Sequence, residues 1–308
     1  MLQLKLIYVW IFLLFGLVSY GQVKEVKDWC VSQCDAVGDE KHNTELVLLQ
    51  MDNDSIMNLI SNPTVKKIPL RIGIIQSDTA HPEISEIVIR RAVDNLNQSF
   101  KDVHFSFYIE RTDLIVSDLK LEDLSANAYS EYNKFSDQYD EEDMISIYIF
   151  DHGEEFCNIT PNSISCGRTG GFSYILSERT NNIVLSRFDI TDIKVVAHEM
   201  AHFWGLYHTF EEYQFGKDDF KSENCHLVGD RVCDTPPDPG AIFEVHVNYT
   251  TCELQNLEDE NGNAYKPMIE NYMSYYKPCY LKEYKFTEGQ NHVMMLAGRQ
   301  PMRQKFFR

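Results

Sequence analysis

The sequence predicts a mixed α/β (α+β) fold in its first part, a sheet backed by helices, followed by an irregular region that needs covalent or metal cross-links. Two observations predict this fold. Apolar runs with the period of strands alternate with segments of helical period as far as about residue 190. From about residue 209 this pattern gives way to loops rich in Gly, Pro, Asp and Cys. The 308 residues are enough for one large domain or two small ones.

The elements of the first part follow in order along the chain. "IPLRIGII" (68–75) predicts a strand, and residues 84–100 place apolar side chains at helical spacing. "VHFSFYI" (103–109) and "MISIYIF" (144–150) predict two more strands, of which the second is central because its apolar run is richer. Three shorter elements are predicted as well, a helix in "SANAYSEYNKF" (125–135) and strands in "GGFSYIL" (170–176) and "NIVLS" (182–186).

The N-terminal residues 1–21 have the pattern of a secretory signal peptide. Lys5 precedes the apolar run "LIYVWIFLLFGLV", and "SYG" places small residues before a cut after Gly21. The alternative is a membrane anchor, but the run is short for a span of roughly 20 residues. No later segment is apolar enough to cross a bilayer, so we expect an exported protein, extracellular or periplasmic. Residues 22–66 lack regular patterning and are interpreted as a leader or pro-segment.

The charge and the cysteines restrict the partners of the chain. A net charge of −19 argues against nucleic acid or an anionic membrane as a partner. Clusters such as "DEED" (140–143) are solvated loops or, alternatively, calcium ligands. The eight cysteines all follow the signal peptide, and in an oxidising compartment an even number favours disulfides. A zinc site at Cys30 and Cys34 would need a second matching pair, which is lacking.

The stretch "DITDIKVVAHEMAHFWG" (189–205) predicts a helix that carries a metal site. It opens with cap-type residues and continues with small and apolar side chains. His198 and His202 are four residues apart, so they lie on one face and can share an ion. Glu199 can reach a water beside that ion and act as its general base without binding the metal. A lone histidine is commonly a core residue, whereas this complete spacing in an exported chain predicts zinc.

The motif continues beyond the helix. Gly205 can adopt a positive φ, end the helix and turn the chain back, so that His208 completes the ligand set. The pattern H-E-x-x-H-x-x-G-x-x-H is the metzincin signature. Metzincins also carry a methionine in a tight turn below the metal, and "ENYMSYY" places Met273 at a suitable distance downstream. Its role would be an apolar floor under the ligands, although a single methionine is commonly plain core.

Over roughly residues 145–297 the chain resembles one metzincin family, the pappalysin or cytophagalysin group. Four stretches carry the resemblance, namely "AHEMAHFWGLYHTF", "GDRVCDTPPDP", "ENYMSYY" and "FTEGQNHVMM". The first is shared by metzincins generally, whereas "GD-x-V-x-DTP" and "FTEGQ" point to this family. The resemblance implies an upper sheet-and-helix lobe (67–208), a lower loop-rich lobe (209–308) and a substrate cleft between them.

The resemblance also implies roles for further residues. Tyr275 matches a family tyrosine that stabilises the oxyanion, and structural calcium would lie near Asp230 and Thr235. Asp234 is a weaker calcium ligand, because turn and cap roles explain many Asp-Thr-Pro stretches. Cys233 departs from the family pattern, because a cysteine is not expected inside the DTP motif. By analogy with the family the expected disulfides are Cys225–Cys252, Cys233–Cys279 and, in a separate short loop, Cys157–Cys166.

We therefore expect a secreted, monomeric zinc endopeptidase that acts on proteins or peptides. Substrate would add to an edge strand of the upper sheet, with "GGFSYIL" (170–176) as the candidate. Two alternatives are a zinc hydrolase of a different bond, which should lack a peptide-length cleft, and a catalytically dead binding protein. The second would usually have lost Glu199 or a histidine, and neither is lost.

The leader is expected to keep the enzyme latent. An open zinc position accepts an inhibitory fourth ligand, and a thiolate binds well at about 2.3 Å. "DWCVSQCD" (28–35) supplies two thiols and two carboxylates before the catalytic domain. Alternatively, Cys30 and Cys34 bond to each other, which leaves Asp28 or Asp35 as the blocking group.

Overall fold

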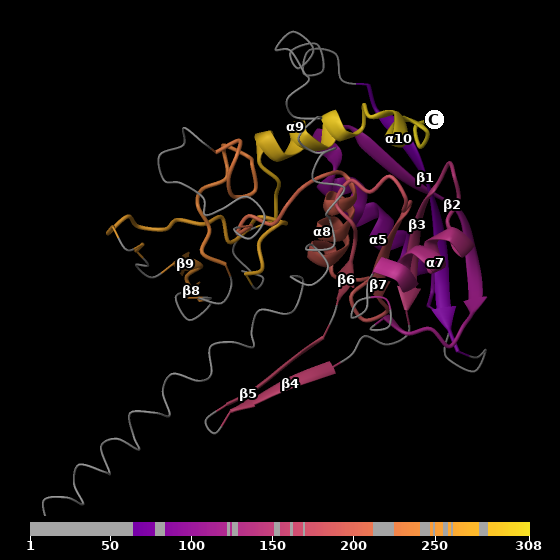
Figure 1. The fold of residues 1–308 in the computed structure, drawn as a ribbon, viewed down its shortest axis with the longest axis horizontal. Helices are drawn as coiled ribbons and strands as arrows, with labels where there is room; N and C mark the ends of the chain where they lie inside the picture. Colours follow the sequence, from indigo (N-terminus) through magenta and orange to yellow (C-terminus); the bar gives the residue numbers. More distant parts are fainter. Residues whose placement is uncertain are drawn as a thin grey trace, which may run out of the picture.

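The computed structural model describes residues 64–77, 84–121, 124, 129–150, 155–160, 163–168, 170–211, 225–240, 247–248, 250–254, 258–259, 261–276 and 283–308. The sheet and its helices lie on one side of the molecule, and irregular chain lies on the other (Figure 1). The predicted signal peptide, nearly all of the predicted leader, and Cys30, Cys34 and Cys279 lie outside the described residues. No helix in the described part is long and apolar enough to cross a membrane.

A five-stranded sheet forms the framework, in the order β2-β1-β3-β7-β6. Its strands are β1 Lys66–Gln76, β2 Phe105–Val116, β3 Ile145–Phe150, β7 Asn182–Ser186 and β6 Gly171–Phe172. The first four strands in this order are parallel to one another, and β6 is antiparallel to β7. Every residue of β3 is buried, which confirms the central position predicted from its apolar run.

Different helices cover the two faces of the sheet. Alternate side chains of a strand point to opposite faces. Ile147 of β3 therefore joins the core formed with α5 Glu86–Ser99 and α8 Ile193–Phe203, whereas Tyr148 joins the core formed with α7 Tyr129–Tyr139. This arrangement confirms the predicted α/β class.

The edge strand β6 is shorter than the strand predicted over 170–176. Only Gly171 and Phe172 pair with β7. At Leu176 the backbone has a φ of 50°, and the Leu176 N–H donates to the carbonyl oxygen of His202 at 3.3 Å. The chain after Phe172 therefore leaves the sheet and runs to the end of α8. The edge position itself is confirmed.

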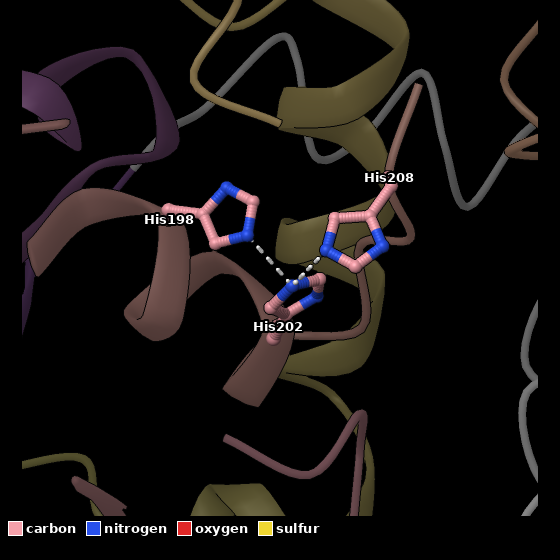
Figure 2. A group of neighbouring side chains, drawn as sticks. All are labelled: His198, His202 and His208. Atoms are coloured by element: carbon pink, nitrogen blue, oxygen red, sulfur yellow. Dashed lines mark hydrogen bonds between the residues drawn. The ribbon is translucent and has the colours of Figure 1, made fainter. Parts of the chain in front are cut away.

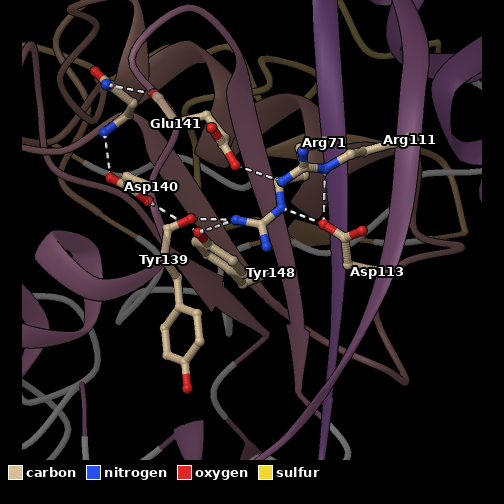
Figure 3. A network of polar contacts seen from close by, with 8 residues as sticks. Arg71, Arg111, Asp113, Tyr139, Asp140, Glu141 and Tyr148 are labelled. Carbon is tan, nitrogen blue, oxygen red and sulfur yellow. Dashed lines mark hydrogen bonds and ion pairs between the residues drawn. The ribbon is translucent and has the colours of Figure 1, made fainter.

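A partly buried polar network joins β1 to its neighbours (Figure 3). On β1, Nε of Arg71 donates to Asp113 of β2 at 2.6 Å, and Nη1 donates to the hydroxyl of Tyr148 at 3.3 Å. That hydroxyl donates to Asp140, just after α7, at 3.1 Å. Burial raises the pKa of Asp140 to about 6, although hydrogen bonds from neighbours that include Asn182 and Tyr148 act in the opposite direction.

The remaining elements are short. β4 Glu155–Thr160 pairs with β5 Ser163–Arg168, and β8 Val247–Asn248 pairs with β9 Glu253–Leu254, both antiparallel. A 3-10 turn, Lys101–Val103, precedes β2.

Two helices, α9 Glu288–Ala297 and α10 Pro301–Gln304, lie near the C-terminal end. They contribute to the core under α5 and α8 with Met294, Leu296, Ala297 and, just after α10, Phe306. The last helices therefore pack on the upper lobe, although the sequence-based division at residue 208 assigns them to the lower one. That division stays a prediction.

The disulfide pairing predicted for Cys225 and Cys233 is wrong. These two residues bond to each other, with their Cα atoms 4.9 Å apart, instead of to Cys252 and Cys279. The reason is local, because the turns between them bring the ends of this eight-residue separation together. Cys252 is also disulfide-bonded. Cys157 and Cys166 occupy directly opposite positions of the β4–β5 ladder, and their disulfide stays a prediction.

Candidate active site

Helix α8 carries the first two histidines into the interior. It starts at Asp192, whose side chain accepts a hydrogen bond from the N–H of Lys194 at 2.8 Å, as a cap residue should. Every residue from Val196 to Phe203 is buried. One turn apart on this helix, His198 and His202 bring their Nε2 atoms to within 3.0 Å of each other.

The turn after α8 delivers the third histidine. Gly205 has a φ of 97°. Its N–H donates to the carbonyl of His202 at 2.8 Å, and the N–H of Leu206 donates to the carbonyl of Ala201 at 3.0 Å. This pair of bonds is the Schellman motif, which ends a helix through a residue in the left-handed region. The chain then turns back, and Nε2 of His208 lies 3.1 Å from Nε2 of His202 (Figure 2).

The three imidazoles fit a zinc ion. Their ligand atoms lie within 4.8 Å of one another. Nitrogen ligands at 2.0–2.1 Å from one tetrahedral ion lie about 3.3 Å apart, close to the distances between these Nε2 atoms. Burial, together with the neighbouring His202 and His208, lowers the pKa of His198 well below its ordinary value. A neutral imidazole is the form that binds a metal.

Hydrogen bonds to Nδ1 orient the first two rings. Nδ1 of His198 lies 2.8 Å from the carbonyl oxygen of Tyr272, and Nδ1 of His202 lies 2.7 Å from that of Leu206. Since a carbonyl only accepts, each Nδ1 carries the proton and each Nε2 presents a lone pair to the cluster.

Glu199 is buried one position after the first ligand. The edge strand packs closely against it. A Cβ added to Gly171 would lie 3.0 Å from Cγ of Glu199 and 2.6 Å from the carbonyl oxygen of Val184. Residue 171 therefore has to be glycine for the backbone of β6 to reach the position beside the predicted base.

The turn around Met273 is bonded to the chain just after the third histidine. Met273 is fully buried, and its carbonyl accepts from the N–H of Thr209, the residue after the third histidine, at 3.2 Å. Its own N–H donates to Oδ1 of Asn271 at 2.8 Å. The side chains of Asn271 and Gln290 bond to each other at 2.8 and 3.2 Å. Gln290 of the "FTEGQ" stretch therefore supports the turn through Asn271.

Asp234 caps α9, which is the ordinary role weighed against calcium binding. Its carboxylate accepts from the Thr287 hydroxyl at 2.7 Å and from the Gly289 N–H at 2.8 Å. This contact brings the "DTP" and "FTEGQ" stretches together. The other predicted calcium ligands also contact each other, since the Thr235 hydroxyl donates to Asp230 at 2.8 Å. Within the described residues, the histidine triad and a group containing Cys225 and Cys233 are the clusters spaced for a metal, and those two sulfurs form a disulfide.

Tyr275 points at the triad. Its hydroxyl lies 3.1 Å from Nε2 of His208. The neighbouring residues are tied together by Asp238, which accepts from the hydroxyls of Thr209 at 2.6 Å and Tyr276 at 2.9 Å. Burial raises the pKa of Asp238. One carboxylate therefore links the residue after the third histidine to the residue after Tyr275.

Sequence reasoning did not assign roles to several residues that shape the site. They are Phe210, Glu211, Asp238, Asn271 and Gln290. Four of them lie inside the motif stretches that carry the family resemblance, and Glu211 directly follows one of these stretches, which was the available signal.

The geometry defines a metzincin-type site on an α/β framework. Residues 177–297 match the family described as pregnancy-associated plasma protein-A. This match agrees with the family that the sequence motifs resemble.

Three relatives, each named extracellular metalloprotease, match part of the chain. The one from Colletotrichum graminicola is 31% identical over 139 residues, which cover 44% of this chain and 41% of the relative. Those from Pyricularia oryzae (33% over 110 residues, covering 36% and 31%) and Arthroderma gypseum (31% over 103 residues, covering 33% and 29%) match less. The chain thus spans about two fifths or less of the length of these relatives.

Two solved structures share the fold. Mature mirolysin of Tannerella forsythia, in complex with a cleaved peptide, has a TM-score of 0.54 and 16% identity, covering 80% of this chain and 97% of that one. A promirolysin mutant from the same organism has a TM-score of 0.54 and 15% identity, covering 89% and 95%.

Proposed function

We propose that the chain is an exported zinc endopeptidase that hydrolyses peptide bonds. The observation that carries the proposal is the convergence of three buried imidazoles beside Glu199 and Tyr275. The relatives named extracellular metalloprotease support both the activity and the export.

His198, His202 and His208 would hold the zinc, which when bound polarises the scissile carbonyl and lowers the pKa of a water. Glu199 would take the proton of that water and pass it to the leaving amine. The hydroxyl of Tyr275 would donate a hydrogen bond to the oxygen on which negative charge develops. Hydrogen bonds to Nδ1 orient the rings of His198 and His202, so these two ligands are positioned before substrate arrives.

An extended peptide would bind along β6. This strand is the edge of the sheet, so its outer backbone groups can pair with a substrate strand. Because Gly171 of β6 lies against Glu199, a peptide bound there would pass beside the base. Mirolysin, whose structure holds a cleaved peptide, gives a precedent for a peptide on this fold.

Calcium near Asp230 and Thr235 belongs to the same proposal. The support is a buried carboxylate and hydroxyl in the loop that also caps α9. Calcium added to chelator-treated protein should raise the melting temperature, and an unchanged melting temperature would end this part of the proposal.

We also propose that residues 22 to about 66 keep the enzyme latent. A neighbour named promirolysin supports a pro-form on this fold. The blocking group would come from "DWCVSQCD", as a cysteine thiolate or as Asp28 or Asp35.

Digestion of casein by the secreted protein, freed of its leader near Val65, tests the activity. A chelator should abolish cleavage, and zinc should restore it. Glu199→Ala should keep about one zinc per chain and lose roughly 10² to 10⁴ in turnover, because the base is not a ligand. Near-normal turnover in this variant would contradict the mechanism. Zinc binding without cleavage of any peptide would favour a hydrolase of another bond or a binding protein.

A further inference from the structure

The third histidine differs from the other two in its Nδ1 partner. His198 and His202 each face a backbone carbonyl. Nδ1 of His208 instead lies 3.5 Å from Oε2 of Glu211, a side-chain carboxylate. In Figure 2 one ring nitrogen of His208 points toward the other histidines and the second points away from them. The carboxylate therefore acts from outside the triad.

Local structure aims Glu211 at this ring. The N–H of Glu211 donates to the carbonyl of His208 at 3.1 Å, which closes a turn and brings the side chain back over the histidine. Between them in sequence, Phe210 stacks on the imidazole with ring centroids 4.9 Å apart and planes at 11°. The imidazole therefore has an aromatic ring stacked on its face and a carboxylate oxygen 3.5 Å from its outer nitrogen.

The pair is shielded from solvent. Glu211 is 6% exposed and His208 is 2% exposed. Among the residues that the structure describes, the ion-pair partner of Glu211 is the imidazole of His208. Charges attract more strongly in such surroundings than in water, and a buried carboxylate without a counter-charge is costly. A dication at the Nε2 side of the ring would supply that counter-charge.

We propose that Glu211 is a positioning residue that raises the affinity of the triad for a divalent cation. It would accept the Nδ1 proton of His208, fix the tautomer that leaves Nε2 free, and increase the basicity of that nitrogen. Partners of this kind contribute about 10- to 100-fold to metal affinity in other proteins. The inference rests on the proposed zinc site, and it does not require that the protein cleave peptides.

Zinc affinity, measured on the full chain by competition with a fluorescent chelator, tests the role of Glu211. Glu211→Ala should weaken zinc binding about 10- to 100-fold. Glu211→Gln should weaken it less, because the amide oxygen still accepts the Nδ1 proton but carries no charge. Glu86→Gln is the matched control, since it removes the same charge from an exposed position on α5 and should stay within about twofold of the parent protein.

The metal-free melting temperature separates positioning from folding. A purely structural Glu211 would lower the melting temperature of the zinc-free protein and leave the zinc affinity of the folded protein unchanged. We expect the reverse for Glu211→Gln, namely an unchanged or higher zinc-free melting temperature with weaker zinc binding. Zinc affinities of Glu211→Ala and Glu211→Gln that equal that of Glu86→Gln would overturn the proposal. If the parent protein binds zinc but cuts no peptide, the proposed function fails and this test still stands.

Discussion

The Tyr275 hydroxyl lies 3.1 Å from Nε2 of His208, close enough to reach charge that develops beside that ligand. Tyr275→Phe keeps the ring and removes this donor. Since the hydroxyl would bond to the oxyanion and not to the ground-state carbonyl, we expect kcat to fall about 100-fold while KM changes little. Steady-state kinetics on a fluorogenic peptide measures both constants.

The competing role for Tyr275 is packing. Its ring lies 4.8 Å from His208 and 4.7 Å from Phe210, so it also covers the third ligand. Phenylalanine preserves these ring contacts. An unchanged kcat together with a lower melting temperature would therefore show that the hydroxyl serves structure rather than catalysis.

At the scale of single residues, the sequence predicted those whose positions depend on local spacing. His198, Glu199 and His202 share one helix, and Gly205 sets the turn that follows. Asp238 lies inside the "GDRVCDTPPDP" stretch, but its contacts with Thr209 and Tyr276 could not be predicted, because they depend on the path of a loop between distant segments. Spacing along the chain carries no information about such a path.

The turn that ends α8 requires glycine, because its backbone has a positive φ. Gly205 has a φ of 97°, and a Cβ there would make contacts no closer than 3.7 Å. Gly205→Ala should therefore lower the free energy of unfolding through backbone strain, by about 1–2 kcal/mol. Because this turn delivers His208, the substitution should weaken zinc binding as well. Urea unfolding of the zinc-free protein and a zinc titration measure the two effects.

Gly262 provides the matched control for strain. It has a φ of 80°, and an added Cβ would meet no atom within 4 Å. Gly262→Ala should cost similar stability and leave zinc affinity unchanged. Equal zinc affinities in the two variants would show that the turn at Gly205 does not govern the third ligand.

The network between α7 and the sheet makes stability depend on pH. The pKa of Asp140 is about 6 in the folded protein and 3.8 as an ordinary value. At a pH between these two values, Asp140 keeps its proton in the folded protein but has lost it in the unfolded chain. The free energy of unfolding therefore falls as the pH rises from about 4 to about 6. A difference of about two pKa units corresponds to about 3 kcal/mol at most.

Asp140→Asn removes this titration, so its stability should depend less on pH over the same range. Urea unfolding of zinc-free protein at pH 4, 5 and 6 measures the slope. Asp137→Asn serves as the control, because Asp137 is exposed on α7, three residues before Asp140, and its substitution should preserve the parent slope. If all three proteins show one slope, Asp140 does not control the pH dependence.

Strands and helices were predictable where periodic burial dominates. β1 and β3 are buried along nearly their whole length, and their apolar runs were found within two residues of the observed ends. β6 was predicted too long, because the turn at Leu176 is imposed by a bond to the end of α8. The Cys225–Cys233 link was missed for a related reason, since family analogy says nothing about turns within this loop.

At the scale of the whole molecule, the helices near the C-terminal end connect the irregular part to the sheet. The N–H of Arg308 donates to the carbonyl of Lys67 at 2.9 Å, and the N–H of Lys66 donates to that of His104 at 2.8 Å. The start of β1 is therefore anchored on both sides from Lys66 onward. A chain that begins near Val65 would keep these contacts, which makes removal of the predicted leader structurally permissible.

The last prediction is that the leader before Val65 keeps the enzyme inactive. The secreted full-length protein and a form beginning near Val65 should be compared on one peptide substrate with saturating zinc. We expect the shorter form to be more active, because a thiolate or carboxylate from the leader would no longer occupy the open position on the metal.

Cys30→Ser and Cys34→Ser, made singly in the full-length protein, then show whether sulfur is responsible. If a thiolate blocks the site, one of them should release activity. If both serine variants stay latent, the carboxylate of Asp28 or Asp35 becomes the blocking group. Equal activity of the two starting forms would end the latency hypothesis.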